Sequence, residues 1–231
     1  MTFRTAEIDL RSLRPQPFGR SHVRSIKDPL IEPLWGGERV LFVVAEPGAE
    51  PEFTDMDGER LEGPALDPIV AELRARLHAD TVALDGYLTR QPNSASSMSP
   101  SLGLTMPSAQ QMAGQMLFGR RSASAPKAPG PAEPAVVDPA AAVAFVAVDL
   151  LAIDDQALLD IPLLERKRIL DTAFEETSLL RLGAFVRPPV DGWLVAWRSI
   201  GFHELAYKSA NSRYTPGRLN PDWARIRIPL D

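Results

Sequence analysis

The sequence predicts an α+β protein in which mostly antiparallel sheets are combined with interspersed helices. Apolar runs of strand length recur along the chain, and segments with helical periodicity lie between them at irregular intervals. No regular alternation of strand and helix, which a parallel sheet would require, is visible. With 231 residues, 45% of them hydrophobic and 24% charged, the chain is long enough for one large domain with a substantial core.

Four segments have the composition of strands. Residues 39–46 (RVLFVVAE) predict a buried strand, and the glycine pair Gly36-Gly37 just before it indicates that a ligand or a backbone comes close. TVALDGYLT predicts a strand interrupted at Asp85-Gly86, AAVAFVAVDLLAID the longest strand, and LLRLGAFVRPP a further one. The C-terminal segments HELAYKSANSRY and DWARIRIPL alternate in polarity on either side of a Pro-Gly turn.

Three segments have helical periodicity. ALDPIVAELRARLHAD predicts a helix with Asp67 as its N-cap and an inner face of Ile69, Val70, Leu73 and Leu77. PLLERKRILDTAF predicts a helix that starts near residues 160–162. DGWLVAWRSIG predicts a helix capped by Asp191 and closed by Gly201, with an inner face of Trp193, Leu194, Trp197 and Ile200.

Composition changes sharply in the middle of the chain. Residues 91–138 are rich in Ser, Pro and Ala, with one short helix-like piece, SAQQMAGQMLFGRR. Such composition cannot bury enough apolar surface to pack by itself. We therefore expect one domain, 1–231, that contains a flexible insertion at 91–138.

The totals exclude several classes of protein. The chain has no cysteine, so disulfides and thiolate metal sites are excluded. No apolar run approaches the ~20 residues of a membrane span, and the N-terminus lacks the apolar core of a signal peptide. We expect a cytoplasmic protein without a membrane partner. The oligomeric state does not follow from the sequence.

Charge is distributed unevenly. The net charge is −5, yet residues 1–31 carry six Arg and Lys against three acids, and residues 198–231 again carry six against three. The segment 32–197 carries 13 against 24. The two basic ends would form one basic patch if they met in space, and scattered surface arginines are the alternative.

Four pieces of the sequence stand in a characteristic order: EPLWGGER, LDGYL, FVAVDLLAIDDQALLDIPLLERKRIL and HELAYKSANSRYTPGRLNPDWARIR. From about Leu30 to Arg227 they resemble the adenylation (nucleotidyltransferase) domain of ATP-dependent DNA ligases, especially the bacterial end-joining type. The family pattern is E-x-K-x-D-G-x-R, L-D-G-E, F-D-L-L, E-G-x-V-x-K and W-x-K-x-K. The resemblance implies the nucleotidyltransferase fold, ATP and Mg²⁺ as cofactors, and DNA or a repair protein as partner.

The reaction implied by the family needs a lysine that attacks the α-phosphate of ATP and becomes lysyl-AMP. Here the lysine position is Leu34 and the following aspartate position is Gly36. Tyr87 replaces the glutamate of L-D-G-E, and Val148 replaces the phenylalanine that stacks on adenine. The chain has only four lysines, and none lies in a K-x-D-G context: Lys27, Lys127, Lys167 and Lys208. No catalytic residue and no metal ligand is therefore predicted.

Other family positions are retained or conservatively replaced. By resemblance they form a nucleotide- or phosphate-binding remnant that consists of Glu32, Arg39, Asp85, Lys208, Arg225 and Arg227. A buried cation needs an anionic partner, so these side chains either pair with local acids such as Glu32 and Asp85 or still meet phosphate.

Two functions follow from the resemblance. The first is a ligase-like pseudoenzyme that binds nucleotide, nucleic acid or protein in a DNA-repair-like setting. The alternative is a ligase-family enzyme with residual nucleotidyltransferase or nick-sealing activity. The sequence stops just after the fifth motif, so the oligonucleotide-binding (OB) domain of ligases is expected to be absent.

Overall fold

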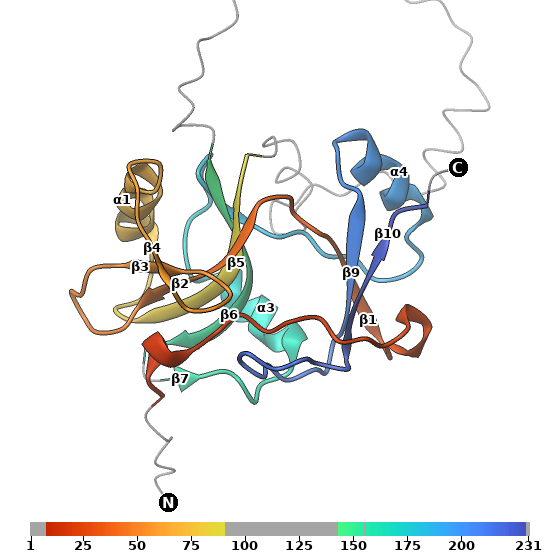
Figure 1. The fold of residues 1–231 in the computed structure, drawn as a ribbon, viewed down its shortest axis with the longest axis horizontal. Coiled ribbons are helices and arrows are strands. Elements are labelled where there is room, and N and C mark those ends of the chain that lie inside the picture. The colour runs from red at the N-terminus through yellow and green to blue at the C-terminus, as the bar shows by residue number, and fades with distance from the viewer. Residues whose placement is uncertain (1–7, 91–142, 155, 230–231) are drawn as a thin grey trace, which may run out of the picture.

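The computed structural model describes residues 8–90, 143–154 and 156–229, which form two sheets that lie beside each other (Figure 1). The larger sheet has the strand order β4-β3-β2-β5-β6-β7, with β8 paired to β6. Its strands are β2 (Glu38–Val44), β3 (Glu52–Thr54), β4 (Arg60–Leu61), β5 (Val82–Thr89), β6 (Ala144–Ile153), β7 (Gln156–Ala157) and β8 (Leu180–Leu182).

The smaller sheet has three strands in the order β1-β9-β10. They are β1 (Pro29–Pro33), β9 (Glu204–Ser209) and β10 (Trp223–Arg227). Every pairing in both sheets is antiparallel except that of β8 with β6. The predicted α+β class with mostly antiparallel sheets is confirmed.

Three α-helices and two 3₁₀ turns complete the described elements. They are α1 (Asp67–Arg76), α3 (Leu163–Leu170), α4 (Asp191–Ser199), η1 (Leu10–Ser12) and η2 (Val23–Ser25). Among the described residues, no helix is long and apolar enough to cross a membrane.

The large sheet is buried on both faces. On β2, Val40, Phe42 and Val44 join the core beneath α1, while Leu41 and Val43 face the opposite side, toward Tyr214 and Trp223. A strand covered on both faces has a continuous apolar sequence rather than an alternating one, which accounts for the run at 39–46. The predicted inner face of α1 packs on the first of these cores through Ile69, Val70, Leu73 and Leu77.

The predicted helix caps were wrong. Asp67 and Asp191 are the first residues of α1 and α4, and the N-cap positions are Leu66 and Val190, without a side-chain cap hydrogen bond. A carboxylate inside the first turn interacts favourably with the positive end of the helix dipole without capping it. The helix that was predicted to start near residues 160–162 is α3, and it begins at Leu163, after Pro162.

Two strand predictions also needed correction. β5 runs unbroken through Asp85-Gly86, and the irregularity there is a register shift in its pairing with β6. Of LLRLGAFVRPP only β8 is a strand, while Val186 forms an isolated bridge to Ile31. The predicted insertion 91–138 lies outside the described residues.

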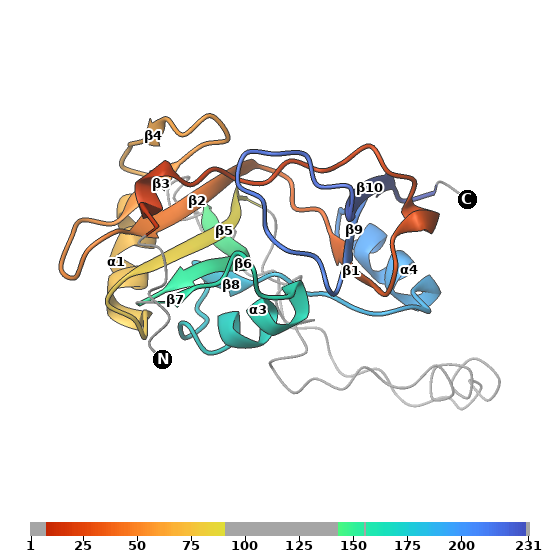
Figure 2. The same cartoon turned by 90° about the horizontal axis from the view of Figure 1, so that it is seen from below.

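Segments near both ends of the described chain run side by side (Figure 2). Phe18 and Asn220 form a bridge, and the Gly19 N–H donates to the Trp223 carbonyl at 2.9 Å. Segments of the two basic ends therefore contact each other, which is the condition for a single basic patch.

Candidate functional site between the two sheets

Two buried lysines share the carboxylate of Glu32. The β1–β9 register puts Leu30 opposite Lys208 and Glu32 opposite Ala206, so Glu32 and Lys208 lie on the same face of the small sheet. Lys208 Nζ donates to Glu32 Oε2 at 2.8 Å. From α3, Lys167 Nζ lies 2.7 Å from Glu32 Oε1, as an ion pair whose angles are not those of a hydrogen bond.

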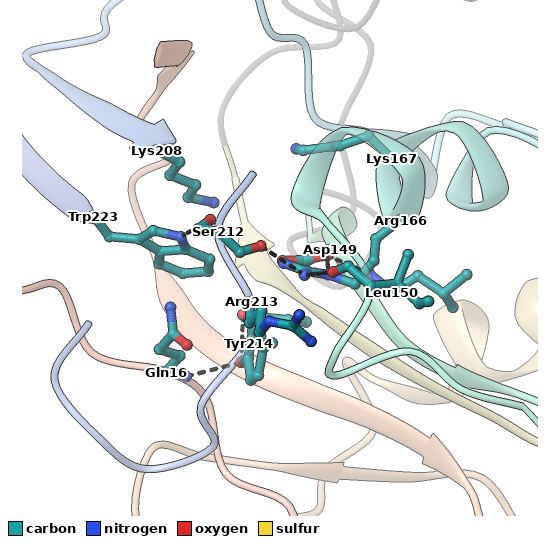
Figure 3. Close-up of polar contacts among 12 residues, drawn as sticks. Gln16, Asp149, Leu150, Arg166, Lys167, Lys208, Ser212, Arg213, Tyr214 and Trp223 are labelled. Atoms are coloured by element: carbon teal, nitrogen blue, oxygen red, sulfur yellow. Dashed lines mark hydrogen bonds and ion pairs between the residues drawn. The ribbon is translucent and has the colours of Figure 1, made fainter. Parts of the chain in front are cut away.

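Both Glu32 and Lys208 have a lowered pKa, but the causes differ. Burial raises the pKa of Glu32, but the ammonium groups of Lys167 and Lys208 outweigh it and leave that pKa below its usual value. Burial lowers the pKa of Lys208, because Glu32 only partly offsets the loss of water and the nearby Lys167 charge. The Lys208 ammonium also lies 4.4 Å from the centre of the Trp223 ring (Figure 3).

Arg39 and Asp85 form a second buried pair. Arg39 Nε and Nη2 donate to the two oxygens of Asp85 at 3.0 and 2.6 Å, a bidentate arrangement. Arg39 Nη1 donates to the Gln16 carbonyl at 2.7 Å, and the Tyr214 hydroxyl donates to Asp85 Oδ2 at 2.7 Å. Burial lowers the pKa of Arg39, but Asp85 outweighs that effect and raises it.

Arg166 and Asp149 form the third pair. Arg166 reaches from α3 to β6 and donates from Nε and Nη2 to Asp149 at 2.8 and 2.7 Å (Figure 3). Its Nη1 donates to the carbonyls of Ile161 and Ser212. Burial raises the pKa of Asp149, but Arg166 outweighs it and the pKa is lowered.

These three groups form one buried charge network, with four cations against three carboxylates. Its charged members are Glu32, Arg39, Asp85, Asp149, Arg166, Lys167 and Lys208. The sequence left open whether the predicted cations pair with local acids or meet phosphate. In the structure Arg39 pairs with Asp85 and Lys208 pairs with Glu32. Arg39 and Lys208 therefore already hold carboxylates.

Three positions that differ from the family pattern lie together in an apolar environment. Leu34, Tyr87 and Val148 all belong to one apolar cluster that joins the two sheets and α4. In this cluster Trp35 packs edge-on against Phe202, with ring centres 5.0 Å apart. Burial raises the pKa of Tyr87 to about 12, so its phenol is neutral at physiological pH.

Gly37, the second glycine of the pair before β2, is explained by a close contact with the backbone of β5. Gly37 has φ +124°, and a Cβ on it would lie 2.1 Å from the Leu88 carbonyl oxygen. Only glycine fits such an approach. A cavity of about 640 Å³ lies beside this turn, lined by Gly36, Gly37, Glu38, Leu88, Thr89, Arg90, Val143, Ile200 and Gly201. Its lining contains Gly36 but none of the retained charged positions.

The structure does not bring all predicted site residues together. Arg225 and Arg227 are exposed on β10, and Arg227 lies 4.0 Å from Glu204 at the edge of ion-pair distance. His203, which stands where the family pattern E-G-x-V-x-K has its glutamate, is also exposed. No group of three or more His, Asp or Glu side chains among the described residues is arranged to hold a metal ion.

Sequence reasoning missed four members of the network or its hydrogen bonds: Asp149, Arg166, Lys167 and Tyr214. All four lie within the motif-like pieces of the sequence. Their pairing joins residues far apart in the chain, such as Glu32 with Lys167, so no local spacing could reveal it.

The chain has the fold of the adenylation domain of ATP-dependent DNA ligases. It is similar to the ligase domain of M. tuberculosis LigD, with a TM-score of 0.58 and 23% identity over 95% of this chain and 61% of that chain. A mycobacterial DNA ligase D complexed with ATP and MES gives a TM-score of 0.59 at 23% identity over 95% of this chain and 62% of that one.

A more distant likeness is to a Lig E DNA ligase described as binding DNA with a minimal scaffold. Its TM-score is 0.51 at 13% identity, over 94% of this chain and 68% of that chain. No protein-family profile and no curated protein sequence matches the chain. The likeness therefore establishes the fold, and the chain spans about 61% of the length of the first ligase domain that it matches.

Proposed function

We propose that this chain is a ligase-like pseudoenzyme that does not form lysyl-AMP and acts by binding nucleic acid or a protein partner in a DNA-repair-like setting. The observation that carries the proposal is the apolar cluster that contains Leu34, Tyr87 and Val148. In the family pattern these positions hold a nucleophile, a carboxylate and a ring that stacks on adenine. Here they pack against Trp35 and Phe202.

The lysines among the described residues support the same proposal. A lysine that attacks a phosphate needs a free, neutral amine that faces the reacting atom. Lys27 is exposed, while Lys167 and Lys208 are both held by Glu32. The lowered pKa of Lys208 favours a neutral amine, but its side chain is only 2% exposed and lies against Trp223.

ATP and Mg²⁺ enter through the likeness to a ligase that was solved with ATP. The described residues fit only part of such a ligand: Glu32 and Arg39 stand at family positions, but each already has a charged partner. Bound ATP would have to displace Lys208 or Lys167 from Glu32, because its adenine would otherwise find no free acceptor there. We therefore expect weak nucleotide binding at most.

The test is incubation of the full chain with α-labelled ATP and Mn²⁺, followed by detection of covalently labelled protein. Wild type should remain unlabelled. A Leu34→Lys/Gly36→Asp variant should also remain unlabelled until Tyr87→Glu and Val148→Phe restore the carboxylate and the stacking ring of the family pattern. Label on the wild-type chain would refute the proposal, and its loss in Lys208→Arg or Lys167→Arg would identify the displaced nucleophile.

Residual nick sealing is the second candidate, favoured by the exposed cations Arg225 and Arg227 on β10. Sealing of a nick that is already adenylated needs positioned charge rather than a lysine nucleophile. We expect no ligated product when excess protein is incubated with a pre-adenylated nicked duplex. Product that disappears in Arg225→Ala would support this candidate instead.

A further inference from the structure

The outer edge of β10 has unpaired backbone groups. β10 is the last strand of the small sheet and pairs only with β9. The Ser209 N–H donates to the Asp222 carbonyl at 2.9 Å, and the Ile228 N–H donates to the His203 carbonyl at 2.8 Å. Because antiparallel pairs alternate, the backbone groups of Ala224 and Ile226 face β9, and those of Arg225 and Arg227 face away from it.

The beginning of this edge is hydrogen-bonded, and η2 lies close to β10. The Trp223 carbonyl accepts from the Gly19 N–H, and the Trp223 N–H donates to the Asn220 carbonyl at 3.2 Å. In the part of the chain that the structure describes, no residue bonds the outward backbone groups of Arg225 and Arg227. These two residues and Ile226 between them are all exposed. An exposed edge of this kind is a template for an added strand.

The side chains along the edge differ between its two faces. Arg225 and Arg227 project from one face, and the Arg227 side chain is 90% exposed. Ile226, 38% exposed, projects from the other face together with Ile228. A groove of about 580 Å³ lies where α4 meets the end of β10, lined by Asp191, Leu194, Val195, Arg198, Ser199, Ile228 and Pro229.

We infer that the β10 edge binds an extended peptide in which acidic and apolar residues alternate, as an added strand of the small sheet. The acidic side chains would lie beside Arg225 and Arg227, and the apolar ones beside Ile226 and the groove at α4. Main-chain hydrogen bonds would provide affinity, and the alternation would provide specificity. This inference goes beyond the proposed function and does not depend on it.

A second copy of this chain fits the edge poorly. Pairing β10 with β10 would place four arginines on one face at cross-strand distance, and like charges in opposite positions destabilise a sheet. Nucleic acid would engage the arginine side chains but leave the backbone edge unused. A peptide strand with acidic side chains would pair with both the arginine side chains and the outward backbone groups of β10.

The test uses the full chain and a fluorescein-labelled peptide with the core Glu-Val-Glu-Val-Glu, measured by fluorescence anisotropy. Arg225→Pro removes the arginine charge together with an outward-facing N–H, and proline is tolerated on an edge strand. Arg225→Ala is the matched variant that removes the charge and keeps the donor. Two further peptides carry N-methyl groups on alternate backbone amides, so that strand pairing is tested without any change in the protein.

Wild type should bind the peptide, Arg225→Pro should bind at least about tenfold more weakly than Arg225→Ala does, and one of the two N-methylated peptides should fail to bind. A peptide with Lys in place of Glu should not bind. The inference is overturned if wild type does not bind, if Arg225→Pro binds as tightly as Arg225→Ala does, or if both N-methylated peptides bind. A dimer that Arg225→Pro dissociates would assign the edge to a second copy and also overturn it.

Discussion

Glu32 is the residue on which the buried charges between the sheets depend most directly. It is the only carboxylate in ion-pair contact with Lys167 and Lys208 among the described residues, and both lysine side chains are 2% exposed. A buried charge is tolerated when it is paired, and it is costly when its partner is removed. Glu32, which by resemblance belongs to the nucleotide-binding remnant, therefore serves here to hold two cations in the core.

Glu32→Gln should destabilise the protein by about 3–5 kcal/mol, because it leaves two buried ammonium groups without a counter-charge. Urea denaturation monitored by circular dichroism would measure the change. Glu38→Gln, the same substitution at an exposed position of β2, serves as the control and should change stability by less than about 0.5 kcal/mol. Equal effects of the two substitutions would contradict the assigned role of Glu32.

The lowered pKa values of Glu32 and Asp149 predict a dependence of stability on pH. A carboxyl whose pKa is lowered by folding adds stability that is complete above its unfolded-state pKa and is lost as pH falls through its folded pKa. The ordinary values are 4.5 for Glu32 and 3.8 for Asp149. Their contribution should thus be constant from about pH 7 to 5 and fall progressively below about pH 4.

Lys208 affects stability at alkaline pH, because its pKa in the folded protein lies below the ordinary value of 10.5. The unfolded chain then holds this proton more tightly, and stability should rise with pH between the folded pKa and 10.5. Denaturation midpoints at intervals from pH 2.5 to 10 would record both limbs. Stability that stays level from pH 5 to 2.5 would show that the carboxylates are not held as the structure has them.

At the scale of elements, the β1–β2 connection determines how the two sheets approach each other. Trp35 and Leu34 pack into the apolar cluster, while Gly37 passes against β5. The glycine of the family motif is thus explained by backbone contact, and its retention does not require a nucleotide. α4 covers the same cluster through Trp193, Leu194 and Trp197.

Gly37→Ala should destabilise the protein by at least about 2 kcal/mol more than Gly48→Ala. Backbone strain of about 1–3 kcal/mol applies to both substitutions, and only Gly37→Ala adds a clash with a packed backbone oxygen. Both glycines have positive φ, +124° and +76°, but only at Gly37 would a Cβ meet a backbone oxygen. Thermal and urea unfolding of the two variants would measure the difference. Similar losses would mean that strain rather than the contact with Leu88 accounts for this glycine.

At the scale of the whole molecule, basic segments from the two chain ends lie close together. Gln16 and Phe18 contact residues 214–220. Residues 18–27 continue from there with Arg20, Arg24 and Lys27 and no acid, and residues 213–220 contain Arg213 and Arg218. All five cations are exposed, and Arg213 pairs with Asp160 at 3.0 Å. A surface of this kind fits the phosphate backbone of nucleic acid better than a compact acidic ligand.

Binding of duplex DNA should weaken as salt rises, with a log–log slope of about −2 to −4, as expected for two to four phosphate contacts. Filter binding or anisotropy between low and moderate salt would give the slope. Arg20→Glu/Arg24→Glu should reduce both affinity and slope, while Arg74→Glu, on α1 away from this surface, serves as the control. An affinity independent of salt would rule out phosphate contacts and leave a protein partner.

Local patterns of the sequence determined the class of fold, the apolar strands, the inner faces of α1 and α4, and the absence of a lysine at position 34. These features depend on residue type and on spacing within one segment, which the sequence displays directly. The helix caps and the extent of LLRLGAFVRPP were misjudged, because a first-turn Asp and a cap Asp look alike in sequence, and strand pairing depends on a neighbour.

Only the tertiary structure decided what the retained charged residues contact. Glu32 and Lys208 are 176 positions apart, and Lys167 joins them from α3. The same holds for the meeting of Leu34, Tyr87 and Val148 in one apolar cluster and for the open edge of β10. Each is a contact, or a missing contact, between distant segments, and the free energy of burying or pairing a group depends on those neighbours rather than on the residues beside it in the chain.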